Sequence, residues 1–129
     1  MRCINQKHLN NKNYFRIIDK LFKLCDQILI YYESIYYEDI KKLLLKSADN
    51  TDVLSTQYTN YGFEKSESFQ FDYNAFMLLK NINTLYDLYD LYGIGEICFY
   101  KNGIEYAESS PCNNTSFYVL DCKEFENLF

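Results

Sequence analysis

Side chains able to do chemistry are few in this chain. Its only histidine, His8, lies in the polar, aperiodic stretch MRCINQKHLNNK, which we predict to be a loose lead-in over residues 1–12. Nucleophilic catalysis by serine or cysteine commonly needs a histidine as base, so such a site would have to be built around His8. We therefore expect no histidine-centred active site and predict that the chain is not an enzyme.

Five cysteines raise the question of metal binding or disulfide formation. They are Cys3, Cys25, Cys98, Cys112 and Cys122. Their number is odd, their spacings match no zinc motif and no apolar leader precedes them, which favours reduced thiols in the cytoplasm. Three of them fall in the C-terminal part, but three thiols leave a tetrahedral zinc site one ligand short. We predict no metal and no cofactor, with the thiols acting as small buried hydrophobes.

Carboxylates and glycines give two weaker signals. Asp87 and Asp90 are three residues apart on a predicted helix and could hold a divalent cation, but a pair without further oxygen ligands binds weakly. The stretch from Gly93 to Glu96, GIGE, precedes a strand instead of opening a helix, so it does not match a phosphate-binding loop. A catalytic pair of carboxylates has no local signature. A small enzyme therefore stays a less favoured alternative.

Length and charge narrow the classes of function. A chain of 129 residues suits one domain, and its net charge is −5. Residues 1–50 hold nine Lys or Arg against six Asp or Glu, whereas residues 51–129 hold four against twelve. Binding of nucleic acid needs a basic patch, and no apolar run approaches the roughly 20 residues of a membrane span. We therefore predict a protein partner and neither nucleic acid nor membrane.

The elements that position these residues begin with helix. Apolar residues from Tyr14 to Ile35 recur at spacings of three and four, and the pattern continues through Leu44. This spacing predicts one long helix or a helix pair. Residues 53–71 are rich in β-branched and aromatic side chains and contain the turn sequence Asn-Tyr-Gly, which predicts one or two strands.

Local chemistry then marks two short helices. Asp72 can cap the segment YNAFMLLKNI, and Asn83 or Thr84 can cap the segment LYDLYDLY. Gly93 follows as a residue that can adopt the left-handed conformation at a helix end. We expect one or two short helices near residues 73–92.

The strongest local signal is a hairpin in the C-terminal part. Two strand-like runs flank Asn102-Gly103, the preferred pair for a type I′ turn. With a two-residue turn, Phe99 opposes Tyr106, and one face of the hairpin packs on the helices. The predicted members of that face are Ile97, Phe99, Ile104 and Tyr106.

The sequence also predicts a third strand and a last helical turn. The segment SFYVLD, residues 116–121, reads as a strand, and Asp121 with Glu124 resembles a capping box. The order of elements predicts an α+β domain over residues 13–129, in which an N-terminal helix or helix pair packs on a largely antiparallel sheet with a C-terminal hairpin.

Two acidic surfaces follow from this arrangement. On a helix, Leu85, Leu88, Tyr89 and Tyr92 share the buried stripe, while Tyr86, Asp87 and Asp90 face outward. On the other face of the hairpin lie Glu96, Tyr100 and Glu105, with Cys98 and Ala107 between them. Tyrosine beside acidic side chains suits a protein interface, so we predict that Tyr86, Asp87, Asp90, Glu96, Tyr100 and Glu105 bind a partner.

The partner that fits these surfaces is a basic protein. Nuclease toxins carry positive charge near their active sites, and complementary charge speeds association with an inhibitor. Small size, acidity and a cytoplasmic location are shared by bacterial immunity proteins, so we expect an immunity or antitoxin-type inhibitor. The alternative is a structural or adaptor domain whose acidity keeps it in solution.

Overall fold

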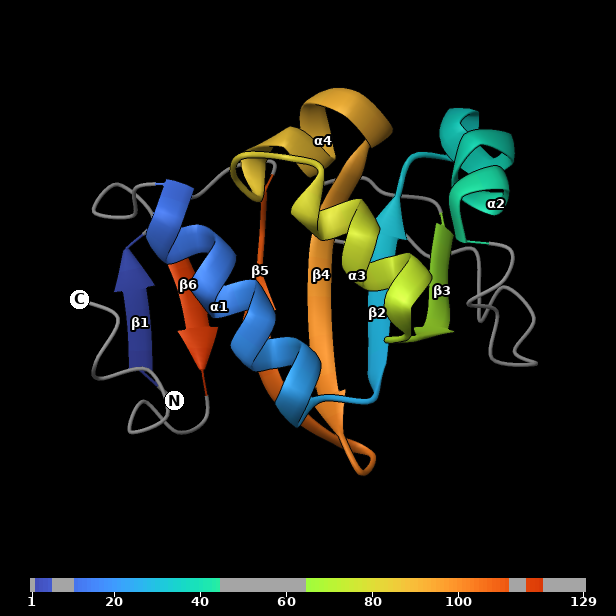
Figure 1. Ribbon diagram of the computed structural model, residues 1–129. Helices are drawn as coiled ribbons and strands as arrows, with labels where there is room; N and C mark the ends of the chain where they lie inside the picture. Colours follow the sequence, from blue (N-terminus) through green and yellow to red (C-terminus); the bar gives the residue numbers. More distant parts are fainter. Residues whose placement is uncertain (1, 6–10, 45–64, 112–115, 120–129) are drawn as a thin grey trace.

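The computed structural model describes residues 2–5, 11–44, 65–111 and 116–119, which form a sheet with helices on one face (Figure 1). The elements are β1 (Arg2–Asn5), α1 (Asn11–Leu24), β2 (Gln27–Tyr32), the 3-10 helix η2 (Ser34–Tyr36), α2 (Tyr37–Leu44), β3 (Lys65–Gln70), α3 (Tyr73–Lys80), α4 (Tyr86–Tyr92), β4 (Ile94–Lys101), β5 (Ile104–Ser109) and β6 (Ser116–Val119). The predicted α+β class is confirmed.

The sheet has six strands in the order β1-β6-β5-β4-β2-β3, and every neighbouring pair is antiparallel. Helices α1 and α3 lie across one face of it, α4 lies at the end of the sheet where β4 begins, and α2 lies beside the edge strand β3 (Figure 1). We call the opposite face of the sheet the far face. Strands β5 and β4 occupy the centre, and β2 is also paired on both sides, so side chains of these three strands make up the middle of each face.

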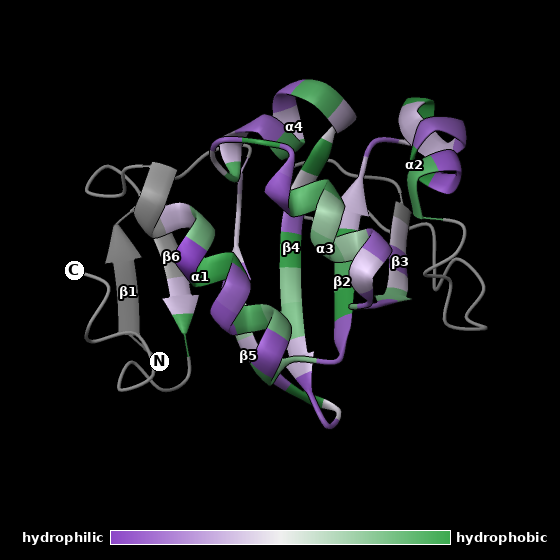
Figure 2. Ribbon diagram, in the orientation of Figure 1, coloured by the Kyte–Doolittle hydropathy of each residue, from purple (hydrophilic) through white to green (hydrophobic). Residues whose placement is uncertain are grey.

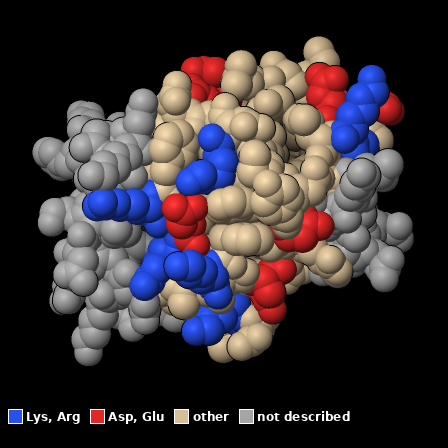
Figure 3. All heavy atoms as spheres, in the orientation of Figure 1, with Lys and Arg blue, Asp and Glu red and all other residues tan. Residues whose placement is uncertain are grey.

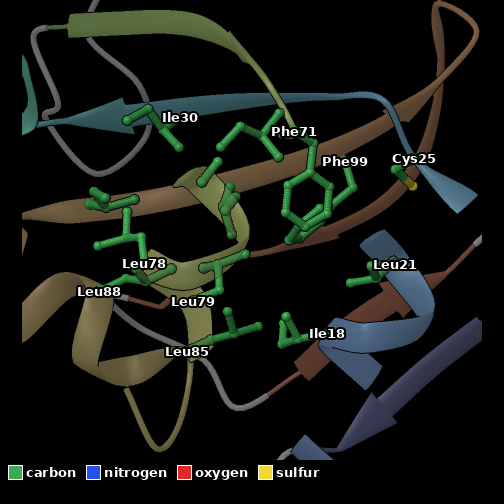
Figure 4. Packing of buried hydrophobic residues seen from close by; sticks show 14 of the residues in the cluster. Ile18, Leu21, Cys25, Ile30, Phe71, Leu78, Leu79, Leu85, Leu88 and Phe99 are labelled. Carbon is green, nitrogen blue, oxygen red and sulfur yellow. The ribbon is translucent and has the colours of Figure 1, made fainter. Parts of the chain in front are cut away.

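The hydrophobic core lies between the sheet and the helices. Apolar and polar residues succeed one another along α1 in bands, as expected of a helix that buries one side (Figure 2). Ile18 and Leu21 of α1 are fully buried, as are Ile30 of β2 and Phe99 of β4. Leu21 and Ile18 lie on the side of the core near Phe99, and Ile30 lies in another part of it (Figure 4). Each such side chain contributes about 1.5–3 kcal/mol when it leaves water.

A buried ionic cluster fixes α2 against the sheet edge. Glu67 of β3 is 1% exposed, and its carboxylate accepts a hydrogen bond of 2.9 Å from the Tyr32 hydroxyl and pairs with the Lys41 ammonium of α2. A buried carboxylate is costly unless it is paired and hydrogen-bonded, so Lys41 holds α2 in one position on the edge strand.

The predicted long helix or helix pair over residues 14–44 is wrong in its middle. Helix α1 ends at Leu24, and Gln27–Tyr32 form a central strand with every second residue buried. Ile28 and Tyr32 satisfy a helical spacing, but Ile28, Ile30 and Tyr32 satisfy strand alternation equally well. Residues 27–32 form a strand because they pair with β3 on one side and with β4 on the other.

The predicted loose lead-in is also wrong for Arg2–Asn5. These residues form the edge strand β1, which pairs with β6 so that Arg2 lies opposite Val119 and Asn5 opposite Ser116. A polar sequence does not exclude a strand at a sheet edge, because an edge strand needs fewer buried side chains.

The local capping predictions are confirmed at Asp72 and Gly93. The Asp72 side chain accepts a hydrogen bond of 3.1 Å from the Ala75 amide at the start of α3, and Gly93 ends α4 with a φ of +65°. The cap predicted at Asn83 or Thr84 is wrong, because the N-cap of α4 is Leu85. Asp87 instead accepts a hydrogen bond of 3.0 Å from the Asn83 amide.

The predicted hairpin is confirmed, but its register is not. Asn102 and Gly103 both have positive φ, at 51° and 80°, as a type I′ turn requires. A bulge between Phe99 and Tyr100 places Phe99 opposite Ala107 instead of Tyr106. Ile104, which we predicted to face the helices, is 65% exposed.

Three further observations complete the comparison of the fold with the sequence. No helix among the described residues is long and apolar enough to cross a membrane. The strand and turn predicted over residues 53–64 and the last helical turn predicted from residue 121 lie outside the described residues. The predicted third strand is confirmed over Ser116–Val119.

Candidate functional site

Strands β2, β4 and β5 bring six titratable side chains together on the far face. They are Tyr31 of β2, Glu96, Cys98 and Tyr100 of β4, and Glu105 and Glu108 of β5, which we call the far-face cluster. Their positions follow from strand alternation, because Ile97 and Phe99 between them are buried in the core. The cluster contains three of the predicted site residues, namely Glu96, Tyr100 and Glu105.

The other three predicted residues do not join this cluster. Tyr86, Asp87 and Asp90 belong to α4, whose Leu88 packs in the core on the helix-covered side of the sheet. Asp90 is exposed, whereas Asp87 is partly buried and engaged with the Asn83 amide. The two predicted acidic surfaces therefore belong to different sides of the sheet.

The bulge is what brings the carboxylates of β5 together. Glu105 lies opposite Tyr100 and Glu108 lies opposite Cys98, so both carboxylates reach the far face although they are three residues apart. One ligand atom from each of Cys98, Glu105 and Glu108 lies within 4.8 Å of the others. Cys98 is 8% exposed and its thiol is free of any disulfide.

Burial, hydrogen bonding and the repulsion between neighbouring acids all act on this cluster. A hydrogen bond with Glu105, followed by burial and the charges of Glu105 and Glu96, raises the pKa of Glu108 to about 7. Burial and then the charge of Glu105 raise the pKa of Glu96. Burial, with the neighbouring carboxylates, also raises the pKa of the Cys98 thiol. Acids placed so close favour their neutral forms.

The two tyrosines of the cluster experience the same field. Burial and the neighbouring acids raise the pKa of Tyr100 to about 12 and raise that of Tyr31. No Lys or Arg among the described residues contributes to any shift within the far-face cluster. By contrast, basic and acidic side chains are interspersed on the helix-covered face (Figure 3).

This arrangement is suited to binding a cation. An incoming positive group would relieve the repulsion among the carboxylates and could lie against the rings of Tyr31 and Tyr100. One carboxylate oxygen of Glu105 is buried without a hydrogen-bond partner and would gain a donor. Cys98, Glu105 and Glu108 are the residues that could also contact a metal ion, although the raised pKa of the thiol makes it a weak nucleophile.

Sequence reasoning missed two members of the cluster. The segment of Tyr31 was predicted as helix, and the predicted register, with Phe99 opposite Tyr106, did not bring Glu108 to the far face. The sequence held a signal for the bulge in Glu105-Tyr106-Ala107-Glu108, where two acidic residues enclose two consecutive apolar residues. Both apolar residues are buried in the structure. This spacing breaks the alternation of a regular strand and is what an extra residue produces.

Comparisons of the chain with protein-family models, with curated proteins and with solved structures gave no match.

Proposed function

We propose that this protein binds a basic protein through the far face of its sheet. The observation that carries the proposal is the placement of three carboxylates, Glu96, Glu105 and Glu108, beside Tyr31 and Tyr100 on three adjacent strands. Burial, followed by the charge of Glu105, raises the pKa of Glu96, and a hydrogen bond with Glu105, followed by burial, raises that of Glu108. Such a cluster destabilises the free protein slightly, and a partner's Lys or Arg side chains remove that penalty on binding.

Tyrosine strengthens this interpretation. Tyr31 and Tyr100 are only partly buried, and they flank the carboxylates on adjacent strands. Tyrosine combines a large contact area with few rotatable bonds, which makes it a frequent anchor of protein interfaces. The central strands are also rigid supports, so the cluster is ordered before a partner arrives.

The class of partner that we propose is a toxin with a cationic active surface, such as a nuclease, which the protein would occlude as an immunity protein does. A nuclease must attract phosphate and therefore carries the complementary charge. An inhibitor of this kind acts by covering a surface and needs no catalytic group of its own.

The test begins with the immobilised protein as bait in an extract of the organism that encodes it. The captured protein is purified, and its association rate is then measured by surface plasmon resonance between 50 mM and 500 mM NaCl. We expect a captured protein with excess Lys and Arg whose association slows at least about tenfold over this range, because salt screens long-range attraction. A neutral or acidic partner, or a rate independent of salt, would contradict the proposal.

A further inference from the structure

A second site lies at the end of the sheet near the hairpin turn. A cavity of about 570 Å³ opens there between the end of α1, the first residues of β2, the end of β3 and the turn that joins β4 to β5. Its volume falls within the range of about 300–1,000 Å³ that is usual for small-molecule sites. None of the residues that line it belongs to the far-face cluster.

Backbone hydrogen bonds hold the walls of this cavity. The Asp26 amide donates to the Tyr100 carbonyl at 2.9 Å, and the Phe71 amide donates to the Asp26 carbonyl at 2.9 Å. Gln27 lies directly opposite Gln70 in the pairing of β2 with β3. The polar side chains of the wall therefore project from the joined ends of β2 and β3, which the hydrogen bond to β4 holds in place, and this fixes their spacing.

The wall is acidic, and the described residues that line it include no basic side chain. Asp26 and Asp72 supply two carboxylates, and Gln27 and Gln70 supply two carboxamides. The Cys25 thiol, which is 5% exposed, also lines the cavity. Burial and then the charge of Asp26 raise the pKa of this thiol to about 12, against an opposing effect of Lys101, so the field of Asp26 reaches into the wall.

Aromatic rings form the apolar side of the cavity. Phe22 meets Phe71 edge to face with centroids 5.4 Å apart, and Phe71 continues to Phe99 at 5.5 Å. Phe71 and Phe99 lie next to each other in the core, and Cys25, in the connection between α1 and β2, lies nearby (Figure 4). Phe76, which stacks on Phe22, already has the Lys80 ammonium 5.5 Å from its centroid.

We propose that this cavity binds an organic cation, a guanidinium or alkylammonium group with a short apolar stem. The carboxylates of Asp26 and Asp72 would pair with its charge, the carboxamides would accept its remaining N–H donors, and Phe22 with Phe71 would contact the stem. An anion would be repelled by the two carboxylates, whereas a cation would be attracted by both. This inference is independent of the partner proposed for the far face.

The same chemistry could come from a free amine or from an Arg side chain of a polypeptide. We would therefore titrate the ¹⁵N-labelled protein with two matched pairs of probes and follow amide shifts by NMR. One pair is n-butylguanidine and neutral n-butylurea. The other is the peptide acetyl-Gly-Gly-Arg-Gly-Gly-amide and its citrulline counterpart, which replaces the guanidinium by an uncharged urea of the same shape.

Two variants each remove one carboxylate of the cavity and are chosen so that the protein still folds. Asp26→Asn changes an exposed side chain, and Asp72→Ser keeps an oxygen that can cap α3. Asp90→Asn, on the exposed face of α4, is the matched control for the loss of one acidic charge. Circular dichroism and the dispersion of the NMR spectrum report whether each variant is folded.

We expect saturable shifts at Asp26 and at the side-chain amides of Gln27 and Gln70, with affinity for the guanidinium at least about tenfold above that for the urea. Asp26→Asn and Asp72→Ser should each weaken binding about tenfold, and Asp90→Asn should not change it. Tighter binding of the Arg peptide than of butylguanidine assigns the site to a polypeptide, and the reverse assigns it to a small amine. Equal binding of the charged and neutral probes, no saturable binding, or affinities unaffected by both cavity variants would overturn the inference.

Discussion

Glu105 and Glu108 share a hydrogen bond on the far face of the sheet, although residues three apart on a regular strand point to opposite faces. The bulge opposite Phe99 and Tyr100 explains this, because Tyr106 occupies the extra position and the alternation resumes at Ala107. Because of this one extra residue, Glu108 lies on the same face as Glu105 and Glu96, and the three carboxylates form one cluster.

Glu108→Gln should change how stability depends on pH. The folded protein holds the Glu108 proton up to a pKa of about 7, above the value of 4.5 of an ordinary glutamate, so between these values the folded state binds more protons than the unfolded state. The contribution of Glu108 is therefore present at low pH and is lost as pH rises through 7.

As pH rises from 5 to 8, we expect the free energy of unfolding of Glu108→Gln to increase by about 1 kcal/mol relative to that of the native protein. This value is reduced because the Glu108 side chain is partly exposed. Urea unfolding at the two pH values measures this change. Glu38→Gln, at an exposed position of α2, is the control and should show no such dependence. An identical response of both variants would contradict the assignment of the shared proton.

Gly103→Val tests the hairpin turn. Gly103 has a φ of 80°, where a β-branched residue is strained, and nothing lies within 4 Å of a Cβ added there, so the cost would come from the backbone alone. We expect a loss of at least about 1 kcal/mol in the free energy of unfolding. Thermal or urea unfolding measures it, and an unchanged stability would show that the turn adopts another conformation.

Lys41→Met tests the buried ionic cluster at the sheet edge. The substitution leaves the carboxylate of Glu67 buried with its hydrogen bond from the Tyr32 hydroxyl but without the Lys41 ammonium, and we expect a loss of at least about 2 kcal/mol in the free energy of unfolding. The double variant Lys41→Met with Glu67→Gln should recover part of this loss, because the uncompensated charge is gone. A double variant less stable than Lys41→Met would contradict this explanation.

The two described free cysteines should react slowly in the folded protein. Cys25 and Cys98 are buried, and burial, together with nearby carboxylates, raises the pKa of both thiols, so little thiolate is present at pH 8. We expect alkylation by iodoacetamide at these positions to be at least about 100-fold slower than in urea. Peptide mapping by mass spectrometry measures each site separately, and fast labelling of either thiol in the folded protein would contradict its burial.

The contrast between Asp72 and Ile28 shows which parts of the fold could be predicted from the sequence. Asp72, Gly93 and the Asn102-Gly103 turn were predicted because caps and turns depend on the chemistry of one or two adjacent residues. Ile28 fits a helix and a strand equally well, and the choice depends on Phe69 and Phe99, its partners in strands far along the chain.

Some residues of the candidate site could likewise be placed from local sequence, and others could not. Glu96 and Tyr100 were placed correctly on one face because alternation within β4 is regular. Tyr31 was missed because its segment was taken for helix, and Glu108 was missed because the register of a hairpin depends on a bulge that packing selects. The separation of α4 from this face depends on how Leu88 packs, which a helical wheel does not specify.

The central claim is that the far face, and not α4, contacts a basic partner, and one comparison of affinities tests it most directly. The variant Glu96→Gln, Glu105→Gln, Glu108→Gln removes three carboxylates from the far face, and the variant Asp87→Asn, Asp90→Asn removes two from α4. Isothermal titration of each variant against the captured partner gives the Kd.

We expect the far-face variant to raise the Kd at least about 30-fold and the α4 variant to raise it less than about threefold, because charges enclosed by an interface contribute far more than exposed ones. A far-face variant that binds as tightly as the native protein, or an α4 variant that loses more affinity than the far-face variant, would contradict the claim.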